Sequence, residues 1–346
     1  MKRWFIMFAL AIFGAAMSSS AIAEVIHATW GGGGAINLAK YVTDPFTEKT
    51  GIVAKVAEVP NTAGTVRSPN ASQYNVVTVT YFESIAMADL DLLEEFEDSE
   101  LPGVQNLPPE LVVRNSAGKI VGIPTSFGYL GIAFRNDMAT AADFASWNNL
   151  ADPKWKGKLS ITRPIYAAPY DLTMFAHANG GDANNVEPGM ATLKGLIANS
   201  LTTYTSLAHM NTLLGRGEVI AVPYYSTRIW QMRRDGVTNL DIVIPKEGAL
   251  MLPYAAVVPK GSSNRADTIT YLEWLISAHS QKAMALATGS LPTNTTVILP
   301  PEFEQSIGMP MKELLAKMYV PDWKVVVANR EERVDAVEQI MANTQK

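Results

Sequence analysis

The sequence predicts an α/β fold built of two lobes or domains, and two observations support this prediction. Segments typical of strands alternate along the chain with segments typical of helices, and no long internal repeat interrupts them. That alternation is the pattern of mostly parallel sheets covered by helices. The chain has 346 residues, which is more than one hydrophobic core usually serves.

The elements can be placed in order from their composition. Apolar and β-branched runs predict strands, and apolar residues spaced three or four apart predict helices. The expected strands cover residues 24–29, 52–59, 75–80, 120–124, 131–134, 158–162, 218–223, 243–245 and 255–258. The expected helices cover residues 35–50, 171–179, 189–199, 228–234 and 265–288, and the acidic residues 89–100 are expected to form a solvated helix face with the loop after it.

The first 23 residues are predicted to be a signal peptide rather than part of the fold. Lys2 and Arg3 give a positive start, residues 4–17 form an uncharged apolar run, and residues 18–23 are small and end in an A-x-A pattern. This order is typical of a secretory signal with cleavage after residue 23. The apolar run is shorter than the roughly 20 residues that span a bilayer. We therefore expect export.

Composition excludes several classes of protein. The chain contains no cysteine, which excludes a disulfide scaffold, a cysteine nucleophile, a thiolate metal site and a lipid-anchoring cysteine at the cleavage point. A lipoprotein is therefore not expected. The net charge is −5 and no basic run is present, so nucleic acid is not an expected partner.

The sequence gives little support for an enzyme. G-x-S-x-G, H-E-x-x-H and Walker A motifs do not occur in the sequence. Residues 116–119 match S-x-x-K, but they lie in a polar turn, where a chance match is the better interpretation. The four histidines have no spacing typical of metal ligands. A secreted hydrolase therefore stays the weakest alternative, and we expect neither enzymatic activity nor a cofactor.

Aromatic, glycine and arginine residues follow the predicted strands. Ligands of α/β proteins bind outside the carboxyl ends of the strands, and binding pockets are mostly apolar and aromatic with a few placed polar groups. The pattern predicts a lined cleft. The candidate ligand-binding residues are Trp30, Gly31, Gly32, Tyr81, Phe127, Tyr129, Arg163, Tyr166, Tyr224, Tyr225, Arg228 and Tyr254.

Six segments in order resemble the polyamine-type (spermidine/putrescine) solute-binding proteins of bacterial ABC transporters. They are Trp30-Gly31-Gly32 with Pro45-Phe46 and residues 49–52, then residues 118–124, residues 150–158, Gly217-Glu218-Val219, residues 245–249 and Leu291-Pro292-Thr293-Asn294. The resemblance implies a type II periplasmic-binding-protein fold with a ligand cleft between two lobes. It places residues 24–126 and 253–300 in lobe 1, residues 127–252 in lobe 2, and residues 301–346 in a C-terminal helical segment packed on the lobes.

The same resemblance implies a monomeric periplasmic receptor that closes about a hinge on a small molecule and delivers it to ABC permease subunits in the inner membrane. Departures from the family pattern bear on the ligand. Thr162 and Arg163 stand where the family carries an acidic pair, and Tyr254 stands where it carries an aspartate. A buried ammonium without a counter-charge is disfavoured, whereas arginine suits carboxylate, phosphonate or sulfonate.

We therefore expect an organic anion or a zwitterion, with Arg163 and Arg228 as its charge partners. For each arginine, an ion pair with a neighbouring acid at the rim is an equally open interpretation. Polyamine and ferric iron stay as alternatives. No metal site is expected unless the ligand is ferric iron. In that case the adjacent phenols of Tyr224 and Tyr225 would bind the iron, and Glu83 is the only nearby acid that could be nominated.

Overall fold

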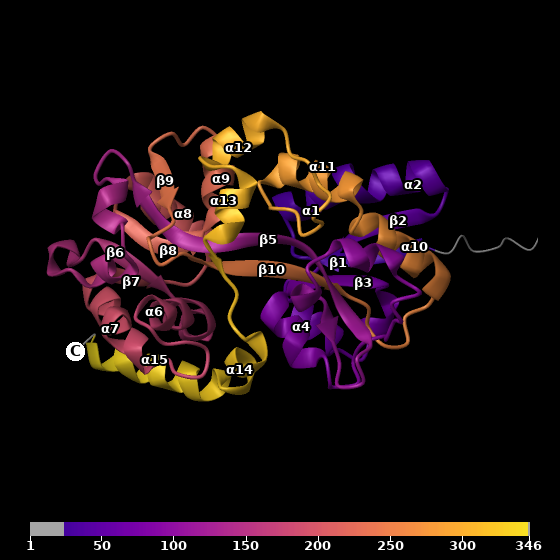
Figure 1. The fold of residues 1–346 in the computed structure, drawn as a ribbon, viewed down its shortest axis with the longest axis horizontal. Coiled ribbons are helices and arrows are strands. Elements are labelled where there is room, and N and C mark those ends of the chain that lie inside the picture. Colours follow the sequence, from indigo (N-terminus) through magenta and orange to yellow (C-terminus); the bar gives the residue numbers. More distant parts are fainter. Residues whose placement is uncertain (1–23, 345–346) are drawn as a thin grey trace, which may run out of the picture.

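The structure is a computed structural model that describes residues 24–344. The predicted signal peptide, residues 1–23, lies outside the described residues. Two α/β lobes lie side by side and are joined by two long strands, β5 and β10 (Figure 1).

The strands are short except for the two that join the lobes. They are β1 (Glu24–Thr29), β2 (Val53–Glu58), β3 (Val76–Thr80), β4 (Val113–Arg114), β5 (Ile120–Arg135), β6 (Leu159–Thr162), β7 (Ser200–Tyr204), β8 (Ala221–Tyr225), β9 (Leu240–Val243), β10 (Ala249–Val257) and β11 (Met318–Tyr319).

The α-helices cover both faces of the strands. They are α1 (Gly33–Leu38), α2 (Asp44–Thr50), α3 (Thr62–Val66), α4 (Tyr81–Met87), α5 (Pro164–Tyr166), α6 (Thr173–Ala178), α7 (Met190–Asn199), α8 (Leu207–Arg216), α9 (Ser226–Arg234), α10 (Arg265–Leu275), α11 (Ala278–Thr288), α12 (Pro301–Ile307), α13 (Met311–Ala316), α14 (Trp323–Ala328) and α15 (Arg330–Thr344).

Shorter 3-10 and π-helical segments complete the chain. The π-helical segments are η1 (Ala39–Thr43) and η8 (Ala167–Leu172), and the 3-10 segments are η2 (Ala71–Gln73), η3 (Pro102–Asn106), η4 (Pro109–Leu111), η5 (Ala141–Phe144), η6 (Trp147–Ala151), η7 (Pro153–Trp155) and η9 (Glu187–Gly189).

The sheet is mixed, with the order β2-β1-β3-β10-β5-β8-β6-β7. In one lobe β1 pairs in parallel with β2 and β3, and in the other β6 pairs in parallel with β7 and β8. Between them β10 and β5 run antiparallel to each other and to their outer neighbours β3 and β8. The prediction of mostly parallel sheets is therefore wrong, because the two joining strands run against the strands that they connect.

The strand β5 corrects a second prediction. Two strands were expected, at residues 120–124 and 131–134, joined through residues 125–130. The structure has one strand from 120 to 135. The pairing with β10 shifts register where Ser126 and Pro124 face it, which leaves Thr125 as an extra residue. This bulge lets the strand continue past the proline.

The prediction of one helix over residues 265–288 is also wrong, because the structure has two helices there, α10 and α11. Ser277 lies between α10 and α11, and its Oγ accepts a hydrogen bond from the backbone N–H of Ser280 at 3.3 Å. A serine in that position caps a new helix. The acidic residues 89–100 form turns rather than a helix, because Leu93 and Phe96 pair as isolated bridges with distant backbone.

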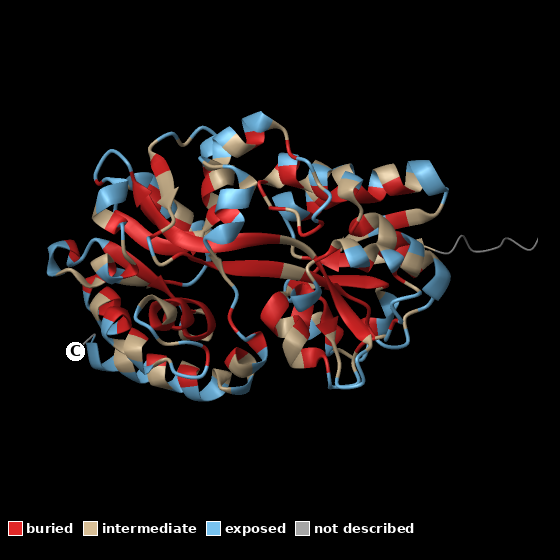
Figure 2. Cartoon of the chain, viewed as in Figure 1, coloured by how far each residue is buried: buried red, intermediate tan, exposed pale blue. Residues whose placement is uncertain are grey.

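The core follows the strands through both lobes, as the buried residues in Figure 2 show. The joining strands are buried along most of their length and become half-exposed at Thr125, Ser126 and Tyr254. The lobe boundaries expected from the sequence, at residues 126/127 and 252/253, fall within β5 and β10. The half-exposed residues therefore lie close to the lobe boundaries expected from the sequence.

The C-terminal segment touches both lobes. α12 and α13 lie near α9 (Figure 1), α14 packs on α4, and α15 packs on η8, α5 and α7. Trp323 of α14 is 4% exposed. Its ring lies 6.3 Å from that of Tyr81 in one lobe and 6.2 Å from that of Tyr170 in the other. This tryptophan therefore bridges the lobes.

Candidate functional site

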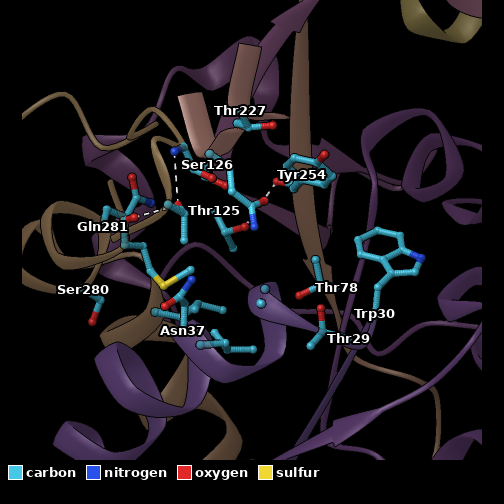
Figure 3. Close-up of a pocket in the computed structure, with 18 of the residues that line it drawn as sticks. Thr29, Trp30, Asn37, Thr78, Thr125, Ser126, Thr227, Tyr254, Ser280 and Gln281 are labelled. Carbon is cyan, nitrogen blue, oxygen red and sulfur yellow. Dashed lines mark hydrogen bonds between the residues drawn. The ribbon is translucent and has the colours of Figure 1, made fainter. Parts of the chain in front are cut away.

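A cavity of about 220 Å³ lies where the two lobes meet the joining strands. Its walls come from the end of β1 and the glycines after it, from α9 of the other lobe, from α11, and from the joining strands at Thr125, Ser126 and Tyr254. Figure 3 shows Trp30 and Thr78 on one side of this cavity and Ser280 and Gln281 on the other. The cavity therefore draws on both lobes, as a hinged ligand site must.

The glycine loop after β1 brings the backbone of one lobe close to the other. Gly32 has φ +85°, a conformation that L side chains rarely adopt. A Cβ added to Gly33 would lie 3.7 Å from Nε2 of Gln231, which belongs to α9 in the opposite lobe. Glycines here leave the start of α1 open toward the cavity.

The charge of the cavity comes from arginine. Arg228 and Arg234 line it, and no aspartate or glutamate is among its lining residues. The Nη1 of Arg228 donates to Oε1 of Gln231 at 3.2 Å. Arg234 donates to the carbonyl oxygen of Ala287 in α11, which leaves Arg228 as the guanidinium with no backbone or carboxylate partner among residues 24–344. The interpretation that Arg228 pairs with a rim acid is therefore not supported.

A second region, which we call the tyrosine cluster, consists of Tyr166, Tyr170, Tyr204, Tyr225 and Tyr254. The rings of Tyr166 and Tyr170 stack 6.2 Å apart, and those of Tyr170 and Tyr225 meet edge to face at 6.5 Å. Burial raises the pKa of Tyr170, Tyr204, Tyr225 and Tyr254. The phenols therefore stay protonated and act as hydrogen-bond donors and aromatic surfaces.

The tyrosine cluster joins the cavity at Tyr254 and reaches the opposite lobe through Tyr170. The ring of Tyr254 lies 6.0 Å from that of Trp30. Burial, and to a lesser extent the neighbouring Tyr254, raises the pKa of Tyr170 and Tyr225. The ring of Phe82, on α4, lies 5.7 Å from that of Tyr170. The cavity and the cluster meet at Tyr254, and we call the two together the interlobe region.

The sequence-predicted residues fall into three groups. Trp30, Gly31, Arg228 and Tyr254 line the cavity, with Gly32 in the same loop. Tyr166 and Tyr225 belong to the tyrosine cluster, and the exposed Arg163 covers the ring of Tyr166 at 5.4 Å. Tyr81 reaches the cluster through Trp323.

Three of the predicted residues lie elsewhere. Phe127 is 2% exposed and pairs with Leu291 through backbone hydrogen bonds. Tyr129 lines a different hollow beside β9. Tyr224 is fully buried, and its hydroxyl donates to Oδ1 of Asn211 at 2.7 Å. These positions support the hinge and the core of one lobe.

Several residues of the region were missed. Tyr170 lies one helical turn after Tyr166, so the i, i+4 spacing of two tyrosines after β6 was an available signal. Thr125, Ser126 and Gln231 carry no distinctive pattern. Trp323 comes from the C-terminal segment, and no local pattern links it to β3 or β6.

His27 has a structural explanation. It is 1% exposed in β1 and shares hydrogen bonds of 2.8 Å with the hydroxyl of Tyr271 and 2.7 Å with Oγ1 of Thr78. Burial lowers its pKa to about 3, so it stays neutral. Within residues 24–344 no helix is both long and apolar enough to cross a bilayer.

A family model described as "Bacterial extracellular solute-binding protein" matches residues 42–311, well over half of the chain. The "Spermidine/putrescine-binding periplasmic protein 1" of Haemophilus influenzae is 22% identical over 259 residues, which cover 72% of this chain and 71% of that protein. The "Putative 2-aminoethylphosphonate-binding periplasmic protein" of Salmonella typhimurium is 26% identical over 271 residues, 73% of each chain.

The fold agrees with solved structures of such proteins. A solved structure titled "Structure of Atu4243-GABA receptor" superposes on this chain with a TM-score of 0.75 at 18% identity. The superposition covers 92% of this chain and 98% of that chain. The resemblance to the polyamine-type family and the two-lobed α/β fold expected from it are thereby confirmed. This chain belongs to the family of bacterial extracellular solute-binding proteins, the substrate-binding components of ABC importers.

Proposed function

We propose that this protein captures a small zwitterion, an amine that also carries a carboxylate or phosphonate group, in the interlobe region and delivers it to an ABC permease. The observation that carries the proposal is Arg228, a guanidinium in a cavity lined by no carboxylate. A planar guanidinium binds carboxylate and phosphonate oxygens in a bidentate geometry.

The names of two relatives support the same ligand class. One is named for 2-aminoethylphosphonate and one for GABA. Both compounds carry a primary ammonium at one end and an acid group at the other. The relative named for spermidine and putrescine favours a polyamine instead. However, a polyamine would place ammonium groups beside the guanidinium of Arg228, and these like charges would repel each other.

Capture follows from where the contacts lie. Trp30 belongs to one lobe, Arg228 belongs to the other, and Tyr254 lies on a joining strand. A ligand that contacts all three residues binds the closed form more tightly than an open form, and this difference in binding free energy shifts the protein toward the closed form. The closed protein is then the form that the permease binds.

The remaining expectations from the sequence are compatible with this proposal and form part of it. They are a cleavable signal peptide, release into the periplasm without a lipid anchor, a monomeric state, no nucleic-acid partner and no enzymatic activity. Arg163 stays a candidate second charge partner at the rim, since no carboxylate within residues 24–344 forms an ion pair with it.

Ferric iron is the less favoured alternative. Burial raises the pKa of both Tyr224 and Tyr225, whereas phenolate is the form that binds ferric iron. The nearest acid, Glu83, accepts hydrogen bonds from the backbone N–H and the Oγ1 of Thr80 in a capping box. Among the described residues, no three His, Cys, Asp or Glu side chains are grouped as a metal site would need.

Isothermal titration of the mature protein with GABA, 2-aminoethylphosphonate, spermidine, putrescine and ferric citrate tests the proposal. We expect saturable binding of a zwitterion, and loss of that binding in Arg228→Ala. Arg233→Ala is the matched control, because Arg233 lies on the same helix but pairs with Asp241 at 3.3 Å outside the cavity. Binding of a polyamine or of iron alone, or equal affinities in the two variants, would overturn it.

A further inference from the structure

A second cavity, of about 380 Å³, lies between helix α9 and the C-terminal segment. Its walls come from α9 and β9 of one lobe, from Gly289 and Leu291 after α11, and from the part of the chain that contains α12 and α13 (Figure 1). None of its lining residues also lines the cavity beside Arg228. Ligand pockets begin at about 300 Å³, so the second cavity is large enough for a small organic molecule.

Helix α9 separates the two cavities, because it presents a different face to each. Arg228 and Gln231 lie on the face toward the first cavity. Ile229 and Arg233 lie on the face toward the second. Residues three or four apart share one face of a helix, so each pair stays with its own cavity. The two cavities are therefore distinct sites, and the guanidinium of Arg228 is not part of the second.

The wall of the second cavity is largely apolar. Isoleucine side chains reach it from α9, from β9 and the residue after β9, and from α12. They are Ile229, Ile242, Ile244 and Ile307. Trp230 and Met309 line it as well. Apolar walls bind the apolar part of a ligand by removing both from water, so we expect the ligand to have an apolar body.

The charged side chains of the lining are paired with one another. The Nη1 of Arg233 lies 3.3 Å from Oδ1 of Asp241, and the Nζ of Lys317 lies 3.8 Å from Oε1 of Glu313. The same Oδ1 of Asp241 also accepts a hydrogen bond from the backbone N–H of Ile242 at 2.8 Å. The charges of the lining therefore cancel. A charged ligand would lose hydration without gaining an unpaired counter-charge, so this site favours an uncharged one.

One hydroxyl in the lining lacks a partner. Tyr129 of β5 is 5% exposed and lines the second cavity. Its backbone N–H donates to Oγ of Ser226 at 3.1 Å, but its hydroxyl forms no hydrogen bond within residues 24–344. Buried tyrosine hydroxyls usually have a partner. Burial raises the pKa of Tyr129 to about 12, so at neutral pH the hydroxyl keeps its proton and can donate it to a ligand's oxygen.

We propose that the second cavity binds a small uncharged molecule whose apolar body lies against the isoleucines and whose carbonyl oxygen accepts a hydrogen bond from Tyr129. This ligand differs in charge and in place from the zwitterion of the proposed function, so the two proposals are independent. A molecule in this position would contact α9, the chain after α11 and the C-terminal segment together.

NMR titration of the mature protein, labelled at its isoleucine δ1-methyl groups, tests the proposal. The four isoleucines named above line the second cavity, whereas no isoleucine within residues 24–344 lines the cavity beside Arg228. The probes are acetophenone, ethylbenzene, which lacks the carbonyl oxygen, and benzoate, which is charged. We expect saturable shifts of these four methyl groups with acetophenone and none with benzoate. The methyl groups of Ile132 and Ile161, which are buried and line neither cavity, should not shift.

Three variants assign the contacts. Tyr129→Phe should weaken acetophenone binding about fivefold, the effect of one hydrogen bond between neutral groups, and leave ethylbenzene binding unchanged. Ile307→Trp should abolish binding of both probes, because the larger ring fills the cavity. Arg228→Ala is the control on the opposite face of α9, and it should leave acetophenone binding unchanged. Thermal unfolding shows whether each variant is folded.

Three results would each overturn this inference: no saturable shift at the four methyl groups with acetophenone, equal losses for acetophenone and ethylbenzene in Tyr129→Phe, or saturable binding of benzoate at the same groups. None of them bears on the proposed function, which depends on Arg228. Where Ile307→Trp does not fold, Tyr129→Phe decides, because that substitution removes a single oxygen atom.

Discussion

The cavity beside Arg228 and the tyrosine cluster meet at Tyr254, but they are built in opposite ways. The cavity is open, lined by glycine and small polar residues, and carries arginines without acids. The cluster consists of aromatic rings in contact with one another, and burial raises the pKa of its phenols Tyr170, Tyr204, Tyr225 and Tyr254. The difference is one of chemistry, because the cavity offers a guanidinium and small polar groups whereas the cluster offers aromatic rings and phenol hydroxyls.

Tyr254→Ala should have the largest effect, because this ring belongs to both regions. We expect affinity for GABA or 2-aminoethylphosphonate to fall about 100-fold, the size of a central hot-spot contact. Tyr254→Phe keeps the ring and serves as the control, with a loss of less than about tenfold. Equal, small losses in both variants would show that the two regions act separately.

Trp323→Ala tests how the cluster is held between the lobes. This side chain is buried between Tyr81 and Tyr170, and removal of a buried tryptophan costs about 3–5 kcal/mol in the free energy of unfolding. Urea denaturation measures the loss. Trp323→Phe should recover much of it by filling the same space, and a loss below 1 kcal/mol for alanine would contradict the bridging role.

The stability of the ligand-free protein should depend on pH through Asp171. In the unfolded chain this carboxyl ionises near its ordinary pKa of 3.8, whereas in the folded protein burial raises its pKa to about 8. Between these values the folded state binds more protons, so stability falls as pH rises through that window.

Thermal unfolding of the wild-type protein and of Asp171→Asn, from pH 5 to pH 8, isolates the contribution of this residue. The melting temperature of the variant relative to wild type should rise across the range. A constant difference in melting temperature would contradict the raised pKa, because it would mean that Asp171 is ionised in the folded protein across this pH range.

Gly32→Ala and Gly34→Ala give the smallest expected effects and probe the cavity side. Gly32 has φ +85°, so alanine there should destabilise by about 1 kcal/mol. At Gly34, inside α1, a Cβ would meet nothing within 4 Å, and alanine should be neutral or stabilise by about 0.5 kcal/mol. Equal changes in melting temperature for the two variants would contradict the conclusion that the backbone conformation at Gly32 disfavours a side chain.

The sequence predicted much of the cavity and less of the cluster, for physical reasons. Trp30, Arg228 and Tyr254 lie at or just after strand ends, where a pattern of consecutive residues is informative. Tyr224 and Tyr225 were predicted together, although successive strand residues point to opposite faces. Tyr225 meets Tyr170, whereas Tyr224 packs on Tyr204 from the core and its hydroxyl donates to Asn211.

Other features could not be predicted because they depend on contacts between distant segments. Trp323 meets Tyr81 and Tyr170 only through the path of the C-terminal segment. The acid Asp171 was given no role, since its carboxyl is identified as unusual only by its burial and by its unpartnered oxygen. The bulge at Thr125, which makes β5 one strand, depends on pairing with β10.

The position of β10 between β3 and β5 governs the order in which this chain can fold. The lobe that contains β1 to β3 lacks a central strand until residues near 257 have emerged, more than a hundred residues after β5. Until then β3 and β5 present unpaired edges, which recruit other chains and promote aggregation. Pairing at such separation is slow, so the newly made chain should depend on chaperone protection for longer than a protein whose neighbouring strands follow one another in sequence.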